Sequence, residues 1–359
     1  MISLTGVTKR YGNTLAVNNL DLSIESGEFI VIIGPSGCGK STTLRMVNRL
    51  IEATSGKIEI DGEDISSYRP EELRRRIGYA IQSVGLFPHM TVEKNIGVVP
   101  ALLKWDEARI KRRVEELLEL LSLDPSIYSD KYPAQLSGGE AQRVGVARAL
   151  AADPSILLMD EPFGALDPIT RESLQREFLR VQRELKKTII FVTHDIDEAM
   201  AMGSKIAIMR DGGLIQFAAP EDILENPADR FVREFIGADS ALKRLALLKV
   251  GPLAVAARTI KESEGLVAAR DKSTPGGTLW VTGESGIVKG WVSPKSLTKA
   301  EKLSDAITSC DPRAAGIEKD DNLRDALSTM VKYGFKTAPV VDKGGVLIGE
   351  LSLSAILEA

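Results

Sequence analysis

The sequence predicts an α/β protein whose first two-thirds form a parallel sheet with helices, followed by a smaller α+β region that contains a tandem repeat. Three short, almost entirely apolar runs lie far apart in the first two-thirds, at residues 29–33, 156–159 and 188–192. Such runs, bounded by turn-forming or charged residues, are typical of strands buried on both faces of a parallel sheet. Helical patterns follow each run, so we expect strands and helices to alternate.

A long segment separates the first two runs and has the pattern of a helical insertion. Between Lys104 and Leu121 it carries apolar side chains at helical spacing opposite a charged face, at Ile110, Val114, Leu117, Leu118 and Leu121. We therefore expect a helical subdomain at about residues 88–150.

Composition limits the class of protein. The chain has 359 residues, with 46 Lys and Arg against 50 Asp and Glu, giving a net charge of −4. This length allows two or three domains, and the balanced charge argues against a nucleic-acid partner. The longest stretch without a charged residue, 77–92, is shorter than the ~18–20 residues of a membrane span. The first ten residues lack the apolar core of a secretory signal, and two cysteines, Cys38 and Cys310, fit a reducing cytoplasm.

The last third contains an internal repeat at an offset of 59 residues, in which 278–297 aligns with 337–356 without a gap. Identical pairs include Val281 with Val340, Gly286 with Gly345 and Ser293 with Ser352. Because the apolar positions also fall in register, the repeat predicts two copies of a unit built as strand, Gly turn, strand and helix.

A glycine-rich loop follows the first apolar run and matches the pattern G-x-x-x-x-G-K-[ST]. Its glycines allow backbone N–H groups to surround a phosphate, and the helix that follows adds its positive end. Lys40 is placed to reach the β- and γ-phosphates and Ser41 to bind Mg²⁺. The candidate nucleotide-binding residues of this loop are Gly34, Pro35, Ser36, Gly37, Cys38, Gly39, Lys40, Ser41 and Thr42.

The other two apolar runs end in groups that could act on the bound phosphate. Residues 156–161 read ILLMDE, which makes Asp160 a candidate metal ligand and Glu161 a candidate general base. The alternative for these carboxylates is a solvated acidic turn. The third run leads into His194, a candidate γ-phosphate contact, although a lone histidine is more often structural.

The sequence LSGGE at residues 136–140 indicates the family. Together with the phosphate loop, Gln82, the ILLMDE strand and His194, it makes residues 1–237 resemble the nucleotide-binding subunit of an ATP-binding-cassette (ABC) transporter, a phosphate-loop NTPase. The resemblance implies ATP and Mg²⁺ as ligands, with Tyr11 stacked on adenine and Gln82 touching Mg²⁺ and water. It also implies that Ala165–Leu166–Asp167 is the loop that crosses to a partner subunit. Gly164 stands where the family usually has serine.

The same motif gives a reason to expect dimers. Ser137, Gly138 and Gly139 open a predicted helix, which forms a second anion-binding end. In the family this end meets the phosphate loop of the other subunit, so that two ATP molecules are sandwiched head to tail. ATP binding then closes the homodimer and hydrolysis releases it.

The repeat resembles a pair of cystathionine-β-synthase (CBS) domains, with a degenerate first copy at 238–302 and a second at 303–359. A cassette followed by a CBS pair is similar to the ATPase of osmoprotectant importers for glycine betaine, carnitine and choline. This resemblance implies a peripheral protein on the cytoplasmic face of the membrane, a second dimer contact through the CBS pair, integral membrane permease subunits, and an extracytoplasmic solute-binding protein as an indirect partner.

Several alternatives stay open at this stage. Ser296 and Ala355 stand where nucleotide-binding CBS repeats commonly carry a ribose-binding Asp, so the CBS pair could bind a nucleotide, a cyclic dinucleotide or nothing. Leu86, Phe87 and residues 90–96 are candidates for permease contact, with core packing as the alternative. The rival functions are a nucleotide-switched regulatory ATPase and an importer subunit for another small solute.

Overall fold

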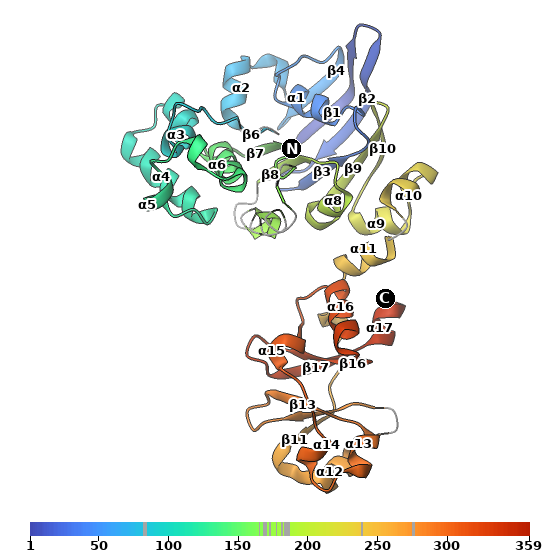
Figure 1. The fold of residues 1–359 in the computed structure, drawn as a ribbon. Helices are drawn as coiled ribbons and strands as arrows, with labels where there is room; N and C mark the ends of the chain where they lie inside the picture. The colour runs from blue at the N-terminus through green and yellow to red at the C-terminus, as the bar shows by residue number, and fades with distance from the viewer. Residues whose placement is uncertain are drawn as a thin grey trace. The chain divides into compact units, whose positions relative to one another are not determined.

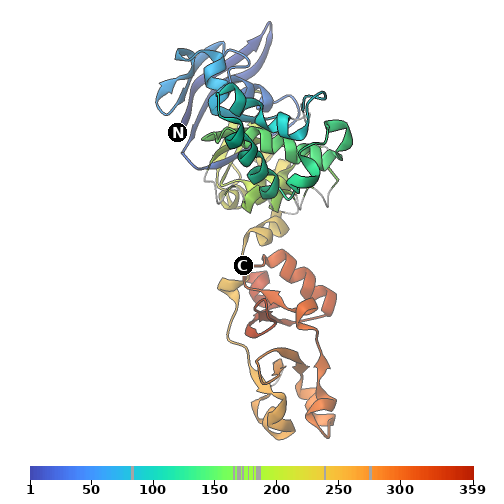
Figure 2. The same cartoon turned by 90° about the vertical axis from the view of Figure 1, so that its left-hand side faces the viewer.

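The computed structural model describes residues 1–81, 85–164, 166–167, 171, 174–176, 178–180, 182, 187–237, 240–274 and 277–359. The chain forms two compact units, residues 1–237 and residues 238–359, which are described separately below. Figures 1 and 2 show the elements of each unit from two sides.

A six-stranded sheet forms the centre of the first unit, and it confirms the α/β prediction. Its order is β10-β9-β3-β8-β7-β6, parallel throughout except for the edge strand β10. The three predicted runs are neighbours in it as β3, β8 and β7. The strands are β3 (Phe29–Ile33), β6 (Ile77–Ala80), β7 (Ile156–Asp160), β8 (Thr188–Val192), β9 (Lys205–Arg210) and β10 (Gly213–Ala218).

Both faces of this sheet are covered, as continuous apolar strands require. In β3, Phe29, Val31 and Ile33 pack into one core while Ile30 and Ile32 pack into the other, and all five side chains are buried. The helices of this unit that the structure describes in full are α1 (Lys40–Val47), α2 (Pro70–Arg76), α3 (Val92–Leu102), α4 (Glu107–Leu120), α5 (Pro125–Tyr128), α6 (Gly138–Leu150), α8 (Ile196–Met202), α9 (Pro220–Glu225) and α10 (Arg230–Ile236).

The helical insertion appears as α3 to α6, which lie together beyond the β6 edge of the sheet (Figure 1). In α4, Val114, Leu117 and Leu118 are buried and Ile110 is partly buried against the same core, as the predicted apolar face requires. Val92 and Ile96 of α3 are also fully buried, so the core alternative holds for these two candidates, whereas Phe87 is 40% exposed.

A second, antiparallel sheet was not predicted. Its order is β2-β1-β4-β5, with β1 (Ile2–Tyr11), β2 (Thr14–Ile24), β4 (Ser55–Ile60) and β5 (Glu63–Asp64). The register of β1 against β2 shifts three times, and positive φ angles occur at Gly6 (57°) and Asn19 (45°). These irregularities break the strict alternation of apolar and polar residues by which half-buried strands are recognised.

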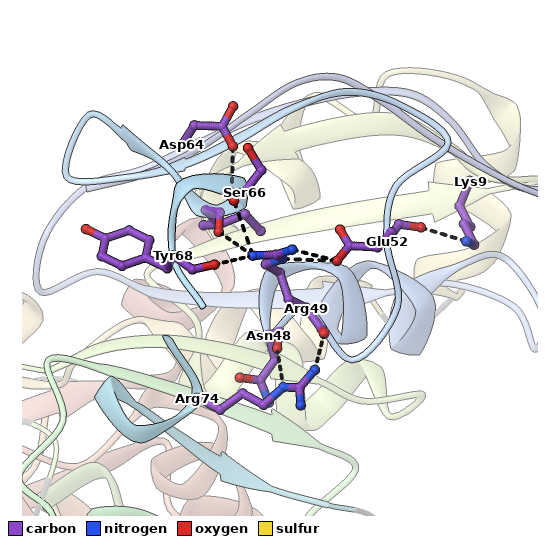
Figure 3. A network of polar contacts seen from close by, with 9 residues as sticks. Lys9, Asn48, Arg49, Glu52, Asp64, Ser66, Tyr68 and Arg74 are labelled. Carbon is purple, nitrogen blue, oxygen red and sulfur yellow. Dashed lines mark hydrogen bonds and ion pairs between the residues drawn. The ribbon is translucent and has the colours of Figure 1, made fainter. Parts of the chain in front are cut away.

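The far end of helix α1 is fixed by a network of arginine contacts, shown in Figure 3. The Arg49 guanidinium donates to the carbonyl of Tyr68 (2.6 Å) and pairs with Glu52 (2.8 Å). The Arg74 guanidinium donates to the carbonyls of Asn48 (3.3 Å) and Arg49. Because carbonyls at a helix end lack partners within the helix, these contacts hold α1 against helix α2 and the turn around Tyr68.

The second unit has the predicted repeat. Each copy runs strand, helix, strand, strand, helix, and the last three elements of the copies superpose in sequence at the offset of 59. The first copy contains β11 (Thr259–Lys261), α12 (Gly265–Lys272), β12 (Leu279–Thr282), β13 (Val288–Val292), α13 (Pro294–Lys299), α14 (Leu303–Ala306) and β14 (Thr308–Ser309). The second contains α15 (Pro312–Ala315), β15 (Ile317–Glu318), α16 (Leu323–Tyr333), β16 (Thr337–Val341), β17 (Leu347–Ser352) and α17 (Leu353–Glu358), and α11 (Ser240–Leu247) precedes both.

The two copies join through matching hairpin turns. Val288 N donates to Gly345 O (3.2 Å) and Leu347 N donates to Gly286 O (3.1 Å). The repeat relates one bond to the other, because Val288 corresponds to Leu347 and Gly286 to Gly345 at the offset of 59. Gly286 and Gly345 have positive φ angles of 78° and 79°, a conformation that favours glycine. The repeat is therefore a two-fold arrangement within one chain.

The chain crosses between the copies at their ends. Val250 is fully buried in the core of the second copy, and its N–H donates to Asp321 O (3.0 Å). Leu303 and Ala306, in contrast, are buried in the core of the first copy. The limits of 238–302 and 303–359 stay a prediction, and the packed bodies exchange short segments across them.

Candidate functional site

Strand register brings three sequence motifs to one edge of the parallel sheet. Ile32 of β3 pairs with Val192 of β8, which pairs in turn with Asp160 of β7. Since the three strands are parallel and in step, the residues that follow them leave the sheet at the same edge, where ligands bind in open α/β sheets. The phosphate loop, Glu161 and His194 therefore share one site.

The phosphate loop connects β3 to α1, and two of its glycines are required by close contacts. A Cβ on Gly34 would lie 2.1 Å from Met209 O, and one on Gly39 would lie 2.4 Å from Ala16 O. Gly39 has a φ of 104° and is the N-cap of α1. The Lys40 ammonium lies in the loop and donates to Gly34 O (2.7 Å) and Pro35 O (3.1 Å). The loop thus holds a cation among backbone groups at a helix N-terminus, a combination suited to phosphate.

The other loop residues differ in how far they are exposed to solvent. Pro35, Ser36 and Gly37 are exposed, and Ser41 and Thr42 are partly buried. Cys38 is 3% exposed and burial raises the pKa of its thiol. A buried thiol with a raised pKa is a poor nucleophile, so Cys38 is a packing residue here.

Ser41 and Asp160 meet at the base of the loop. The Ser41 hydroxyl donates to Asp160 Oδ1 (2.8 Å), and burial raises the pKa of this carboxyl, which is 3% exposed. Two hard oxygen donors beside a phosphate loop fit Mg²⁺, which is usually held by one or two protein ligands together with phosphate oxygens. In the described part of the chain, no group of three or more His, Cys, Asp or Glu side chains is arranged to hold a metal ion.

Glu161 and His194 form a pair beside this site. His194 Nδ1 lies 3.2 Å from Glu161 Oε2, and their side chains are 61% and 19% exposed. Glu161 has a φ of 46°, and its N–H donates to the carbonyl of Val192 at the end of β8 (2.9 Å). The strained backbone of Glu161 is thus fixed by the strand that leads into His194, which brings the two side chains together.

The LSGGE segment forms the start of α6. Ser137 is its N-cap: its hydroxyl accepts from Glu140 N (3.3 Å), and Glu140 accepts from Ser137 N (2.7 Å), a complete capping box. A hydrogen bond from Tyr128 (2.5 Å) is the main reason that the pKa of Glu140 is lowered. Ser137 and Gly138 are exposed and Gly139 is partly buried, so this capped helix end faces solvent. A helix N-terminus of this kind can bind an anion.

The remaining predicted site residues are Tyr11, Gln82, Ala165 and Asp167, of which the structure describes Tyr11 and Asp167. Tyr11 is 48% exposed at the end of β1, and the Lys9 ammonium lies 4.9 Å from its ring centroid. Asp167 is exposed, and its carbonyl accepts from Arg171 N (2.9 Å). Gln82 and Ala165 lie outside the described residues.

Three residues near the site were missed by the sequence analysis. Arg171 joins Leu166, the residue before Asp167, to Asp195, the residue after His194. Asn95 is fully buried and bonds to the loop that presents Phe87, and the Arg148 guanidinium donates to the carbonyl of Gly85 (2.8 Å). A polar side chain on the buried face of α3 was the one available signal for Asn95.

Family models match two parts of the chain. The model described as "ABC transporter" matches residues 17–164, and the model described as "CBS domain" matches residues 310–359. These two matches agree with the cassette and with the second repeat.

Relatives of known type match the whole chain. The glycine betaine/carnitine/choline transport ATP-binding protein OpuCA of Bacillus subtilis is 45% identical over 368 residues, covering 100% of this chain and 96% of the relative. The osmoprotectant import ATP-binding protein OsmV of Salmonella typhimurium is 44% identical over 371 residues, with the same coverage.

A solved structure resembles the first unit. The dimeric structure of MJ0796, a bacterial ABC transporter cassette, is 37% identical, with a TM-score of 0.56 over 61% of this chain and 99% of that chain. Another structure of the same cassette is a post-hydrolysis state bound to ADP and Pi. Within the described ranges, no helix of this chain is long and apolar enough to cross a membrane. The chain belongs to the ABC transporter family, as one of its ATP-binding proteins that carry a C-terminal CBS domain.

Proposed function

We propose that the chain is the ATP-hydrolysing subunit of an importer for quaternary amines of the betaine type, working as a homodimer on the cytoplasmic face of the membrane. The observation that carries the ATPase part is the single sheet edge at which the Ser41–Asp160 contact and the Glu161–His194 pair flank the phosphate loop. Each group needed to bind and hydrolyse a phosphate anhydride has a candidate there.

Nucleotide binding would use groups already gathered at the loop. Backbone N–H groups of residues 34–42 and the Lys40 ammonium would bind the phosphates, and Tyr11 would stack on adenine with its exposed ring. Ser41 and Asp160 would hold Mg²⁺, which neutralises charge on the phosphates when bound. The Ser41 hydroxyl can coordinate through an oxygen lone pair while it donates its hydrogen bond to the Asp160 carboxylate.

Hydrolysis would begin with Glu161. Its carboxylate would accept the proton of a water aligned with the γ-phosphate, while Gln82 would help to place that water. His194 contacts Glu161 through Nδ1, and its largely exposed ring leaves the other ring nitrogen available to the γ-phosphate. His194 would thereby fix both the base and the phosphate at a common position.

A second subunit would complete the site. The capped end of α6, at Ser137, Gly138 and Gly139, would bind the γ-phosphate held by the partner, and Asp167 would cross to the partner's site. ATP would then hold the dimer closed until hydrolysis and phosphate release open it. The second unit would add a further dimer contact.

The permease would dock in a groove of about 340 Å³ between the sheet and the helical insertion. Its apolar lining includes Ile81, Phe87 and Val99, and the first two are 36% and 40% exposed. An apolar groove of this kind fits the apolar face of a short helix. Arg74 and Arg148 also line it, and burial lowers the pKa of Arg148 because its charged form is poorly solvated. A carboxylate on the docked helix would therefore be favoured. The expected occupant is thus an amphipathic permease helix with an acidic residue.

The substrate class rests on the whole-chain relatives, whose names specify glycine betaine, carnitine, choline and osmoprotectants. Uptake of labelled glycine betaine, carnitine and choline at high osmolarity would test it, in cells carrying the intact protein, Glu161→Gln or the control Glu107→Gln. Glu107 is exposed at the start of α4. We expect uptake to be lost only with Glu161→Gln. Unchanged uptake of all three solutes in that variant would refute the proposed substrates.

The regulatory alternative differs in its partners. Purification of the tagged chain from solubilised membranes should recover an integral membrane protein in a fixed ratio to the ATPase. If no integral membrane protein is recovered although the chain hydrolyses ATP, the function as a regulatory ATPase is supported instead of the function as a transporter subunit.

A further inference from the structure

Arg171 connects the two loops on which the catalytic groups of neighbouring sites would sit. Its Nη2 donates to the carbonyl of Leu166 (3.1 Å), the residue before Asp167. Its Nη1 donates to Oδ2 of Asp195 (3.3 Å), the residue after His194. One guanidinium therefore bridges the loop aimed at the partner subunit and the loop that contacts this subunit's own γ-phosphate.

Asp195 is well placed to transmit a movement. Its Oδ1 caps α8 by accepting from Asp197 N (2.9 Å) and Glu198 N (3.2 Å), so that Oδ2 faces Arg171. The Asp195 N–H donates to the hydroxyl of Thr193 (3.0 Å) at the end of β8. The Asp195 carboxylate thus joins α8 and the His194 loop to Arg171 as one body.

A second side-chain contact joins the same two helical segments, about one helical turn further along each of them. Gln175, four positions after Arg171 and also helical, donates through Nε2 to Oε1 of Glu198 (2.7 Å). Glu198 is 6% exposed and lies on α8, three positions after Asp195. Two parallel contacts resist rotation better than one, so the helical residues after Asp167 and helix α8 are expected to move together.

We infer that Arg171 is a positioning residue that couples the two ATP sites of the dimer, by making the Leu166–Asp167 loop follow the His194 loop. The inference rests on the proposed ATP-sandwich dimer. When His194 closes on a γ-phosphate, the Asp195–Arg171 bridge draws the Leu166 carbonyl with it and sets Asp167 for the partner's site. The planar fork of arginine suits this task because it donates in two directions at once, whereas a lysine ammonium lacks that fixed geometry.

The test is the dependence of ATP hydrolysis on ATP concentration, measured with the full-length protein. The wild type should give a sigmoidal curve with a Hill coefficient approaching about 2, the number of coupled sites. In Arg171→Lys the Hill coefficient should fall to about 1, with a several-fold lower kcat and a half-saturating ATP concentration within about twofold of the wild type.

A second variant separates coupling from folding. Asp195→Asn keeps a good N-cap for α8 but loses the charge that faces Arg171. It should lower the Hill coefficient as Arg171→Lys does, and the double variant should fall no further, because both changes break one bridge. Arg180→Lys, at an exposed arginine nine positions after Arg171, serves as the matched control and should keep the wild-type curve.

Three results would overturn the inference. Sigmoidal curves of wild-type steepness in both Arg171→Lys and Asp195→Asn would show that the bridge does not couple the sites. A lower Tm and lower kcat without a change in the Hill coefficient would leave Arg171 a structural role only. A wild-type protein that hydrolyses ATP without cooperativity, or that does not dimerise with ATP in the Glu161→Gln background, would refute the sandwich dimer and the inference with it.

Discussion

Asn95 offers the sharpest test of how the permease groove is built. Its side chain is fully buried at the start of α3 and bonds four times to the loop that presents Phe87. Oδ1 accepts from Phe87 N (2.7 Å), and Nδ2 donates to Phe87 O (3.1 Å). Nδ2 also donates to the carbonyls of Met90 and Thr91, each at 3.0 Å.

The cost of losing these bonds can be estimated. At roughly 1 kcal/mol for each hydrogen bond, Asn95→Ala should cost about 3–4 kcal/mol. For a unit of this size 1 kcal/mol corresponds to roughly 2–4 °C, so the Tm of the cassette should fall by roughly 6–16 °C. Scanning calorimetry of the full chain would measure the shift. The control Asn13→Ala, in an exposed turn between β1 and β2, should leave the Tm unchanged.

The isosteric variant Asn95→Asp predicts the direction in which the loss of Tm changes with pH. Asn95→Asp keeps the acceptor for Phe87 N but turns a carboxylate oxygen toward three carbonyls in a buried position, which raises the pKa of the new carboxyl. A raised pKa penalises folding above that pKa, and the penalty is relieved as pH falls through it. The Tm deficit of Asn95→Asp should therefore be large at pH 8 and smaller at pH 5. A deficit below about 2 °C for Asn95→Ala, or one for Asn95→Asp that grows on acidification, would refute this account of the loop.

Three further predictions concern the site. Glu161→Gln should bind ATP normally while kcat falls by roughly 10²–10⁴-fold, and turnover at the wild-type rate would exclude Glu161 as the base. Cys38→Ala should retain ATPase activity within about twofold, and the folded wild type should react slowly with N-ethylmaleimide at pH 7, because the thiol is buried with a raised pKa. Burial also raises the pKa of Glu198, so its charged form costs stability above that pKa. The Tm of Glu198→Gln should therefore exceed that of the wild type at pH 8, with a gap that narrows toward pH 5, and a gap that widens on acidification would contradict the sign.

The central sheet and its site edge could be predicted from local sequence, and the reason is physical. Strands β3, β7 and β8 are buried on both faces, so their side chains are apolar without alternation and the runs stand out. Gly34 follows the first run directly, and Asp160 and Glu161 follow the second. Because the carboxyl ends of parallel strands lie at the same edge of the sheet, these residues are expected at that edge. That these residues meet at one edge could therefore be predicted, although their contacts could not, and their roles stay predictions.

Contacts between distant segments lay beyond local pattern. Arg171 and Asp195 are both common surface residue types, and only the tertiary fold brings them within 3.3 Å. In the antiparallel sheet, the irregular backbone at Gly6 and Asn19 interrupts the alternation that would have indicated strands. The crossing of short segments between the two repeats is likewise invisible to an alignment of the repeats, because aligned positions report similarity and not packing.

That crossing has a consequence for synthesis of the chain. Val255 exchanges two backbone hydrogen bonds with Glu350 (2.8 and 2.9 Å), so the segment that leaves the ribosome first in this unit needs a partner made almost last. About one hundred residues separate them, which at 5–20 residues per second is a wait of roughly 5–20 s. During that interval the apolar side chains around Val250 have no core to enter, and they are a natural target for a chaperone. Chains stalled or truncated near residue 340 should therefore be degraded even though the ATPase unit ahead of them is complete.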